Sequence, residues 1–232
     1  SFHQRTRLAT DDGTINGKMA IWSRTKLEEK RRDMGPYTFA CQIMQNPVAD
    51  GVMGFKREWL RFYDDEPGEI ADGTNLYLLV DAASEKKKSS DYTAMWVVGL
   101  NGDRNAYVVD MVRDRFNLTE RARKVIELHR KWRPRQVRYE QYGMQADVEH
   151  IRHLQREENY RFNIDEVGGS TPKVDRIRRL IAWFEQGRIW LPRVLAYRDY
   201  EGIARDLVSS FIEDEYVAFP VAVHDDMLDA LA

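Results

Sequence analysis

The chain has 232 residues, of which 43% are hydrophobic, and its formal net charge is −2, so it can bury one sizeable core with a smaller appendage. No apolar run approaches about eighteen residues and the N-terminus lacks a signal pattern, so we expect a soluble protein that is not secreted. Its single cysteine, Cys41, excludes an internal disulfide and a cysteine-based zinc cluster, as is typical of a reducing compartment.

Charge is distributed unevenly along the chain. Residues 113–138 carry ten Lys or Arg against three Asp or Glu, residues 173–198 carry seven against two, and residues 199–232 reverse the balance to one against nine. Separate basic and acidic surfaces suit a protein that contacts phosphates on one side and holds cations at another point. Solvated helix faces produce the same runs, so charge alone leaves both interpretations open.

Residues 1–70 differ in character from the rest and are predicted to be a linker, the end of a preceding domain. A charged helix is expected over 26–34, where Gly-Pro ends it, and a short amphipathic helix over 37–45. The acidic stretch 64–73 is predicted to be a loop. We therefore place the domain boundary near it, with a second domain over 71–232.

A buried strand opens the second domain. Leu76–Ala83 (LYLLVDAA) is predicted to be buried on both faces at the centre of an α/β sheet. Asp81 stands at its C-terminal end, where open α/β sheets bind their ligands. Strands over 93–100 and 105–110 follow, joined by a hairpin turn at Asn101-Gly102.

Helices and strands alternate in the remainder of the chain. The helices are predicted over 118–131, 145–158, 172–186 and 200–212 and from about 225, and the strands over 136–140, 162–167, 189–191 and 216–223. Three antiparallel strands followed by helix-linked strands predict an α/β fold of the ribonuclease H-like type, a mixed sheet flanked by helices on both faces.

Two further acidic sites are placed to meet Asp81. Glu140 ends the strand QVRYE, and a helix starting near residue 225 would place Asp225 and Asp226 one turn before Asp229. Acids in a first helical turn also stabilise the helix terminus, which is the alternative explanation, but Asp229 lies beyond the best capping positions.

Crowded carboxylates repel one another and need a compensating cation. Their hard oxygen donors suit Mg²⁺ or Mn²⁺. Two such ions about 4 Å apart can activate a water molecule and stabilise the leaving oxygen of a phosphodiester. The acids therefore predict metal-dependent hydrolysis of nucleic acid.

The order of these motifs resembles one family. VDAA, SSDYTAMWVVG, YEQYG, TPKVDRIRRLIAWFEQGRIWLP and HDDMLDALA follow one another as in the C-terminal nuclease domain of the large terminase subunit of tailed bacteriophages. The earlier stretch IWSRTKLEEKRRDMGPYTFACQIMQNPV resembles the segment that joins the packaging ATPase to that nuclease. Together these stretches cover nearly the whole chain.

The resemblance implies an endonuclease that cuts concatemeric double-stranded DNA at the start and end of head filling. It implies metal ligands at Asp81, Glu140 and either Asp225 or Asp226, with Asp229 as an additional ligand or support. Periodicity does not decide between Asp225 and Asp226. For the full-length protein, the resemblance implies the portal and the small terminase subunit as partners. It also implies a location in the cytoplasm of the host cell.

The ATPase motifs of the family are absent from this sequence. The segment GTINGK at 13–18 is one residue short of a phosphate loop, and Met19 stands where Ser or Thr would bind Mg²⁺. We expect the chain to cleave DNA without pumping it. Because it begins without Met and stops within a helical pattern, we expect a fragment of a longer protein.

Basic side chains near the predicted site are candidates for contact with DNA phosphates, because cations at a helix N-terminus are electrostatically misplaced. The candidates are Lys173, Arg176, Arg178 and Arg179 on the helix after Pro172, and Lys86, Lys87 and Lys88 in the loop after the first strand. Solvated surface is the alternative for all of them.

Three other functions compete with the terminase nuclease. A Holliday-junction resolvase of the same fold is the nearest. An actin-like ATPase or sugar kinase would need glycine-rich phosphate hairpins, which VDAASEKK lacks. A docking module would bind DNA or a portal through its basic surface without chemistry.

Overall fold

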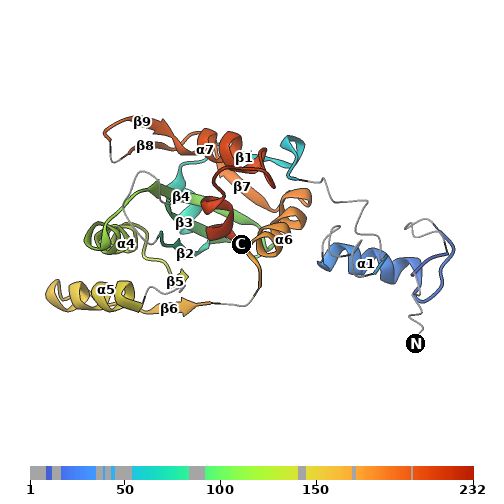
Figure 1. Ribbon diagram of the computed structural model, residues 1–232, viewed down its shortest axis with the longest axis horizontal. Coiled ribbons are helices and arrows are strands. Elements are labelled where there is room, and N and C mark those ends of the chain that lie inside the picture. Colours follow the sequence, from blue (N-terminus) through green and yellow to red (C-terminus); the bar gives the residue numbers. More distant parts are fainter. Residues whose placement is uncertain are drawn as a thin grey trace, which may run out of the picture.

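The structure is a computed structural model that describes residues 9–11, 17–34, 39, 43–44, 54–83, 92–140, 145–168, 171–199 and 201–232. Its centre is a seven-stranded sheet with the strand order β1-β7-β4-β3-β2-β5-β6 (Figure 1). The strands are β1 (Arg61–Tyr63), β2 (Asn75–Asp81), β3 (Thr93–Leu100), β4 (Ala106–Asp114), β5 (Gln136–Glu140), β6 (Ile164–Val167) and β7 (Ile189–Pro192). The β2-β3-β4 pairings are antiparallel and the other pairings are parallel, which confirms the predicted mixed sheet.

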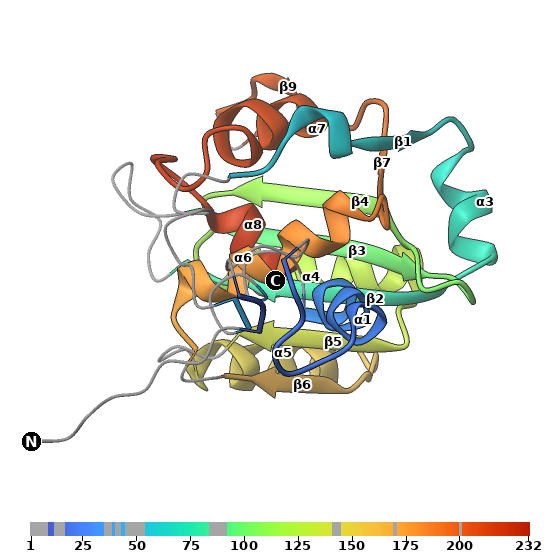
Figure 2. The same ribbon diagram turned by 90° about the vertical axis from the view of Figure 1, so that its right-hand side faces the viewer.

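Helices cover both faces of this sheet, as predicted. One face packs against α4 (Leu118–Trp132) and α5 (Gln145–Glu157). The opposite face packs against α6 (Lys173–Glu185), α7 (Leu207–Ser210), the π-helical turn η2 (Phe211–Tyr216) and α8 (Asp226–Leu231). In Figure 2, α6 and α8 lie in front of the strands and α4 and α5 lie behind them. Each face therefore has its own hydrophobic core.

The local sequence explains why α4 begins and ends where it does. The Asn117 side chain accepts the backbone N–H of Glu120, whose own side chain accepts the backbone N–H of Asn117, so the two residues form a capping box. Val125 and Leu128 on the inner side of the helix are buried against the sheet. The helix ends at Arg133, which adopts a left-handed conformation.

The strand β3 is buried on both faces, whereas β2 is not. Seven of its eight residues are buried, as its apolar sequence TAMWVVGL would suggest. In β2 the buried residues alternate with partly exposed ones, so the predicted burial of both faces of this strand was wrong. Its partly open face contacts α8, which brings the acidic end of the chain next to Asp81.

The segment 200–223 differs most from the prediction. The helix predicted over 200–212 is correct for residues 207–212, which form α7 and the start of η2. Before them, β9 (Ala204–Asp206) pairs with β8 (Ala196–Arg198) in a hairpin that was not predicted. Asp199 accepts the backbone N–H groups of Glu201 and Ile203, and Gly202 has a φ of 82°, so the chain turns there.

The strand predicted over 216–223 was also wrong. The backbone N–H groups of Val217, Phe219 and Val221 donate to carbonyls three to five residues earlier, so this part of the chain continues the helical turns of η2. The described residues there form no sheet ladder.

Two loop predictions need smaller corrections. The connection between β3 and β4 spans residues 101–105 and is longer than a two-residue turn. The Asn101 side chain accepts the backbone N–H groups of Asp103 and Asn105 within it. The acidic stretch 64–73 contains a short helix, α3 (Pro67–Asp72), with proline in its first turn.

The part before residue 71 also contributes to the sheet. The strand β1 pairs with β7, and Phe55 and Trp59 of the preceding segment, which includes η1 (Arg57–Trp59), lie in the same core as Phe184. Farther toward the N-terminus, α1 (Arg24–Met34) confirms the predicted charged helix. Only 39, 43 and 44 of the helix predicted over 37–45 are described. The boundary at residues 70 and 71 stays a prediction.

Within the ranges that the structure describes, every helix is too short or too polar to cross a lipid bilayer.

Candidate metal centre

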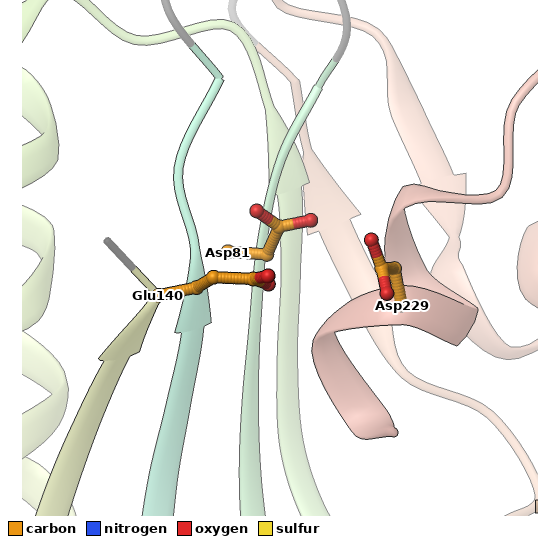
Figure 3. Close-up of side chains that lie close together, drawn as sticks. All are labelled: Asp81, Glu140 and Asp229. Atoms are coloured by element: carbon orange, nitrogen blue, oxygen red, sulfur yellow. The ribbon is translucent and has the colours of Figure 1, made fainter. Parts of the chain in front are cut away.

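Three carboxylates from three separate elements meet at one edge of the sheet. Asp81 ends β2, Glu140 ends the neighbouring parallel strand β5, and Asp229 projects from α8. One oxygen atom of each side chain lies within 4.8 Å of the others. Figure 3 shows Glu140 and Asp229 approaching Asp81 from opposite sides. Parallel pairing of Val80 with Tyr139 places the two strand ends together, and α8 completes the group.

Asp225 and Asp226, the other two predicted ligands, lie beside this group. Asp225 is the N-cap residue of α8, and one of its carboxylate oxygens lies 2.7 Å from the Lys173 ammonium nitrogen. Asp226 is buried and accepts the backbone N–H of Tyr92 at 3.3 Å. The carboxylate that joins Asp81 and Glu140 is thus Asp229, which the sequence predicted as an additional ligand or support. Which of these acids binds a metal stays a prediction.

Two of the basic residues predicted to contact DNA, Lys173 and Arg176, lie against the acids, and their contact with DNA stays a prediction. The Lys173 ammonium nitrogen lies 3.5 Å from Asp229 and 3.9 Å from Asp226, in addition to its contact with Asp225. Arg176 donates to both carboxylate oxygens of Asp229, at 2.7 and 2.8 Å, and to Glu140. Both cations therefore neutralise part of the acidic charge from the start of α6.

The other predicted DNA contacts are placed differently. Arg178 lies 3.8 Å from Asp175 of the same helix, and Arg179 is exposed to solvent. Lys86, Lys87 and Lys88 lie outside the described residues. Contact of these side chains with DNA stays a prediction.

The surroundings oppose the ionisation of Asp81. Burial, followed by the charges of Glu140 and Asp229, raises the pKa of Asp81 to about 7. Burial also raises the pKa of Glu140 and Asp229, although Arg176 and Lys173 act against it. The acids therefore remain short of positive charge in spite of the two cations. Clustered carboxylate oxygens that lack positive charge fit a divalent cation such as Mg²⁺ or Mn²⁺.

Two of the three acids, Glu140 and Asp229, also border an open cleft of about 300 Å³. Glu140, Arg176 and Asp229 line it together with Arg138 of β5 and Thr171, which precedes α6. An anionic substrate in this cleft would meet the guanidinium groups of Arg138 and Arg176 beside the carboxylates. The cleft therefore gives a phosphate group access to the acidic group.

A buried polar network on the α4 and α5 side of the sheet supports the ends of both strands. Arg121 Nε donates to Asp147 at 2.6 Å, and the Tyr139 hydroxyl donates to the same carboxylate oxygen at 2.6 Å. Arg121 also donates to the carbonyl of Ala83 at 3.0 Å. Tyr139 immediately precedes Glu140 and Ala83 lies two residues after Asp81, so the network holds the backbone next to both acids.

This network was not predicted, although the sequence carries a signal for it. Arg121 lies four residues before Val125 and seven before Leu128, in the stripe of α4 that is otherwise apolar. An arginine in such a stripe needs a buried acceptor, because an unpaired charge in a core is costly.

Comparisons with known proteins show the family and the fold of the chain. A family model described as the terminase RNaseH-like domain matches residues 78–232. Among solved structures, the human cytomegalovirus terminase nuclease domain, manganese-soaked and inhibitor-bound, superimposes with a TM-score of 0.53. It is 14% identical, over 76% of this chain and 92% of that chain, and it shows the same fold.

Two weaker structural similarities complete the comparisons. The large terminase nuclease from thermophilic phage G20c with bound magnesium is 16% identical over 75% of this chain and 83% of that chain, with a TM-score of 0.41. T. thermophilus RuvC in complex with a Holliday junction substrate is 14% identical over 49% of this chain and 78% of that chain, with a TM-score of 0.32. No curated protein sequence matches the chain.

Proposed function

Because the chain belongs to the terminase RNaseH-like nuclease domain family, we propose that it is a metal-dependent endonuclease that cuts viral double-stranded DNA during genome packaging. The observation that carries the proposal is the meeting of Asp81, Glu140 and Asp229 within 4.8 Å at the end of the sheet. Its substrate would be concatemeric DNA. The full-length protein would act at the portal together with a small terminase subunit.

The metal would be Mg²⁺ or Mn²⁺, held by Asp81, Glu140 and Asp229. The acidic oxygen donors support this choice, and the cytomegalovirus domain of the same fold was soaked with manganese. Two ions, when bound, would activate a water molecule and stabilise the leaving oxygen of the phosphodiester. Asp225 and Asp226, which also lie close to the Lys173 ammonium group, are the candidates to complete a second ion position.

The chain's own residues would prepare this chemistry in three ways. The strand ends hold Asp81 and Glu140 as fixed oxygen donors, and α8 supplies Asp229 from the opposite side. Lys173 and Arg176 reduce the repulsion among the acids before a metal binds. Arg138, in the wall of the cleft, would contact a DNA phosphate next to the acids.

Substitution of Asp81 by Asn tests this proposal. Asp81→Asn keeps the shape of the side chain and removes its charge, so we expect Mn²⁺-dependent cutting of plasmid DNA to fall by roughly 100-fold or more. The protein should stay folded, as judged by circular dichroism. Asp103→Asn, in the exposed turn after β3, removes the same charge at the other end of the sheet and should leave cutting unchanged.

Full activity of Asp81→Asn would defeat the assignment of the site. Comparing branched with plain duplex DNA separates the terminase from a resolvase, since the proposal predicts cutting of the plain duplex. Binding of DNA without cutting, across several divalent metals, would favour a docking module instead.

A further inference from the structure

We infer that Glu215 is a positioning residue, which holds α8, and with it Asp229, against the strand ends that carry Asp81 and Glu140. The inference rests on the proposed function, because it assigns Glu215 a part in building that site. Glu215 lies in η2 and its side chain has no solvent-exposed surface. It belongs to neither the acidic group nor the cleft.

Glu215 performs the capping of α8 that the N-cap residue would ordinarily perform. Its Oε2 atom accepts the backbone N–H groups of Met227 at 2.9 Å and Leu228 at 3.1 Å, in the first turn of α8. These N–H groups have no acceptor within the helix and need one from outside it. Asp225 holds the N-cap position, but its side chain makes no capping hydrogen bond.

Because Glu215 caps α8 in place of Asp225, the carboxylate of Asp225 is placed elsewhere. Its carboxylate lies 2.7 Å from the Lys173 ammonium nitrogen and so faces the acidic group. Since Glu215 caps the helix from ten residues earlier in the chain, Asp225 remains available to that group. A capping role for Asp225 would draw its carboxylate toward the helix N–H groups and away from Lys173.

The short length of α8 makes its position depend on such contacts. The helix has six residues, too few to be stable by itself in water. Besides Glu215, the indole N–H of Trp96 donates to the carbonyl of Met227 at 2.8 Å, and Asp226 accepts the backbone N–H of Tyr92. Asp229 follows within one turn of Met227, so a shift of these anchored residues moves its carboxylate as well.

A buried carboxylate at position 215 is costly, which favours a specific role over simple packing. Burial raises the pKa of Glu215 to about 7, while the charge of Arg113 and the N–H groups of α8 act in the opposite direction. Arg113 Nε lies 3.3 Å from Glu215 Oε1. An apolar side chain of similar volume would avoid this desolvation, but it would leave the first turn of α8 without an acceptor.

Three variants test the inference. Glu215→Met keeps the length of the side chain and removes the acceptor, whereas Glu215→Gln keeps one acceptor oxygen. Glu213→Ala is the matched control, because Glu213 lies in the same segment but is exposed and pairs with Arg57 instead of α8. The readouts are the Kd for Mn²⁺ from calorimetry, the Mn²⁺ dependence of plasmid cutting, and Tm without metal.

We expect Glu215→Met to weaken Mn²⁺ binding by about 10- to 100-fold, as residues that orient metal ligands typically do. Glu215→Gln should recover most of the lost affinity, and Glu213→Ala should bind as the unmodified protein does. The Kd is measured at a temperature at which Glu215→Met is folded. Its loss of Mn²⁺ affinity is therefore not explained by a lower Tm. If Glu215→Met does not fold, near-normal binding by Glu215→Gln supports the inference, and lost binding by a folded Glu215→Gln overturns it.

Other outcomes contradict the inference in distinct ways. Mn²⁺ binding by Glu215→Met equal to that of the unmodified protein would overturn the positioning role. Equal losses in Glu215→Met and Glu213→Ala would show that general destabilisation of η2 is responsible, which also overturns it. If the unmodified protein neither binds Mn²⁺ nor cuts DNA, it is the proposed function that fails.

Discussion

The carboxyl group of Asp81 lies where burial and two neighbouring acids all oppose its ionisation. Its pKa rises to about 7 in the folded protein, whereas in an unfolded chain an aspartate has a pKa of about 3.9. Between about pH 4 and pH 7 the folded state therefore binds a proton that the unfolded state has lost. The contribution of Asp81 to the free energy of unfolding then falls as the pH rises through this window.

The fall of this contribution with rising pH predicts how the stability of the metal-free protein depends on pH. Relative to the unmodified protein, Asp81→Asn should gain stability as the pH rises from 5 to 8, by an amount on the order of a few kcal/mol. The measurement is urea unfolding of both proteins in the presence of a chelator at several pH values. Parallel curves for the two proteins would contradict the predicted environment of Asp81.

At the residue scale, the sequence predicted the strand-end acids better than the acids of α8. Asp81 and Glu140 follow from their positions after apolar strands. Asp225, Asp226 and Asp229 are too closely spaced for periodicity to decide which one faces the sheet. Which of them faces the sheet depends on Lys173, which contacts Asp225 from another helix, and on Glu215, which caps α8 from η2.

At the scale of elements, α4 and α5 hold the strand ends through the network of Arg121, Asp147 and Tyr139. Asp147 receives hydrogen bonds from the other two side chains, and all three are buried. Removing the carboxylate would leave the Arg121 guanidinium buried without its counter-charge.

We expect Asp147→Ala to lower the free energy of unfolding by about 3–5 kcal/mol, as is typical when one partner of a buried ion pair is removed. Urea unfolding checks this, with Glu149→Ala on the exposed side of α5 as the control. The double variant Arg121→Met with Asp147→Ala should recover part of the loss, because no uncompensated charge remains. A loss below about 1 kcal/mol, the value of a surface pair, would show that the network does not hold the strand ends.

The elements that were predicted well carry their own boundary signals. The strand β5 has the predicted bounds, and α4 begins at a capping box that can be read from the sequence. Residues 200–223 carry no comparable signal. Their hairpin depends on hydrogen bonds that the Asp199 carboxylate accepts, and their helical turns pack into the core through Phe211 and Tyr216.

At the scale of the whole molecule, strand order decides which residues become neighbours. The strand β2 pairs with β3 on one side and with β5 on the other, so Asp81 and Glu140 meet although 58 residues separate them in the sequence. The order of antiparallel and helix-linked strands predicted this arrangement. The edge pairing of β1 with β7 was missed, because three-residue strands have little pattern of their own.

The family match covers residues 78–232 and agrees with the observed sheet, whose edge carries the three acids. The two cores hold these acids from opposite faces, with α8 on one side of the sheet and the network of Arg121 on the other. The cluster of acids is therefore a product of the whole fold and of no single motif.

The most direct test of the central claim is a crystal grown or soaked with Mn²⁺ and measured at a wavelength where manganese scatters anomalously. We expect an anomalous peak about 2.1 Å from oxygen atoms of Asp81, Glu140 and Asp229, the distance typical of small hard divalent cations. An ordered crystal with these three carboxylates in place, and with manganese bound only elsewhere, would contradict it.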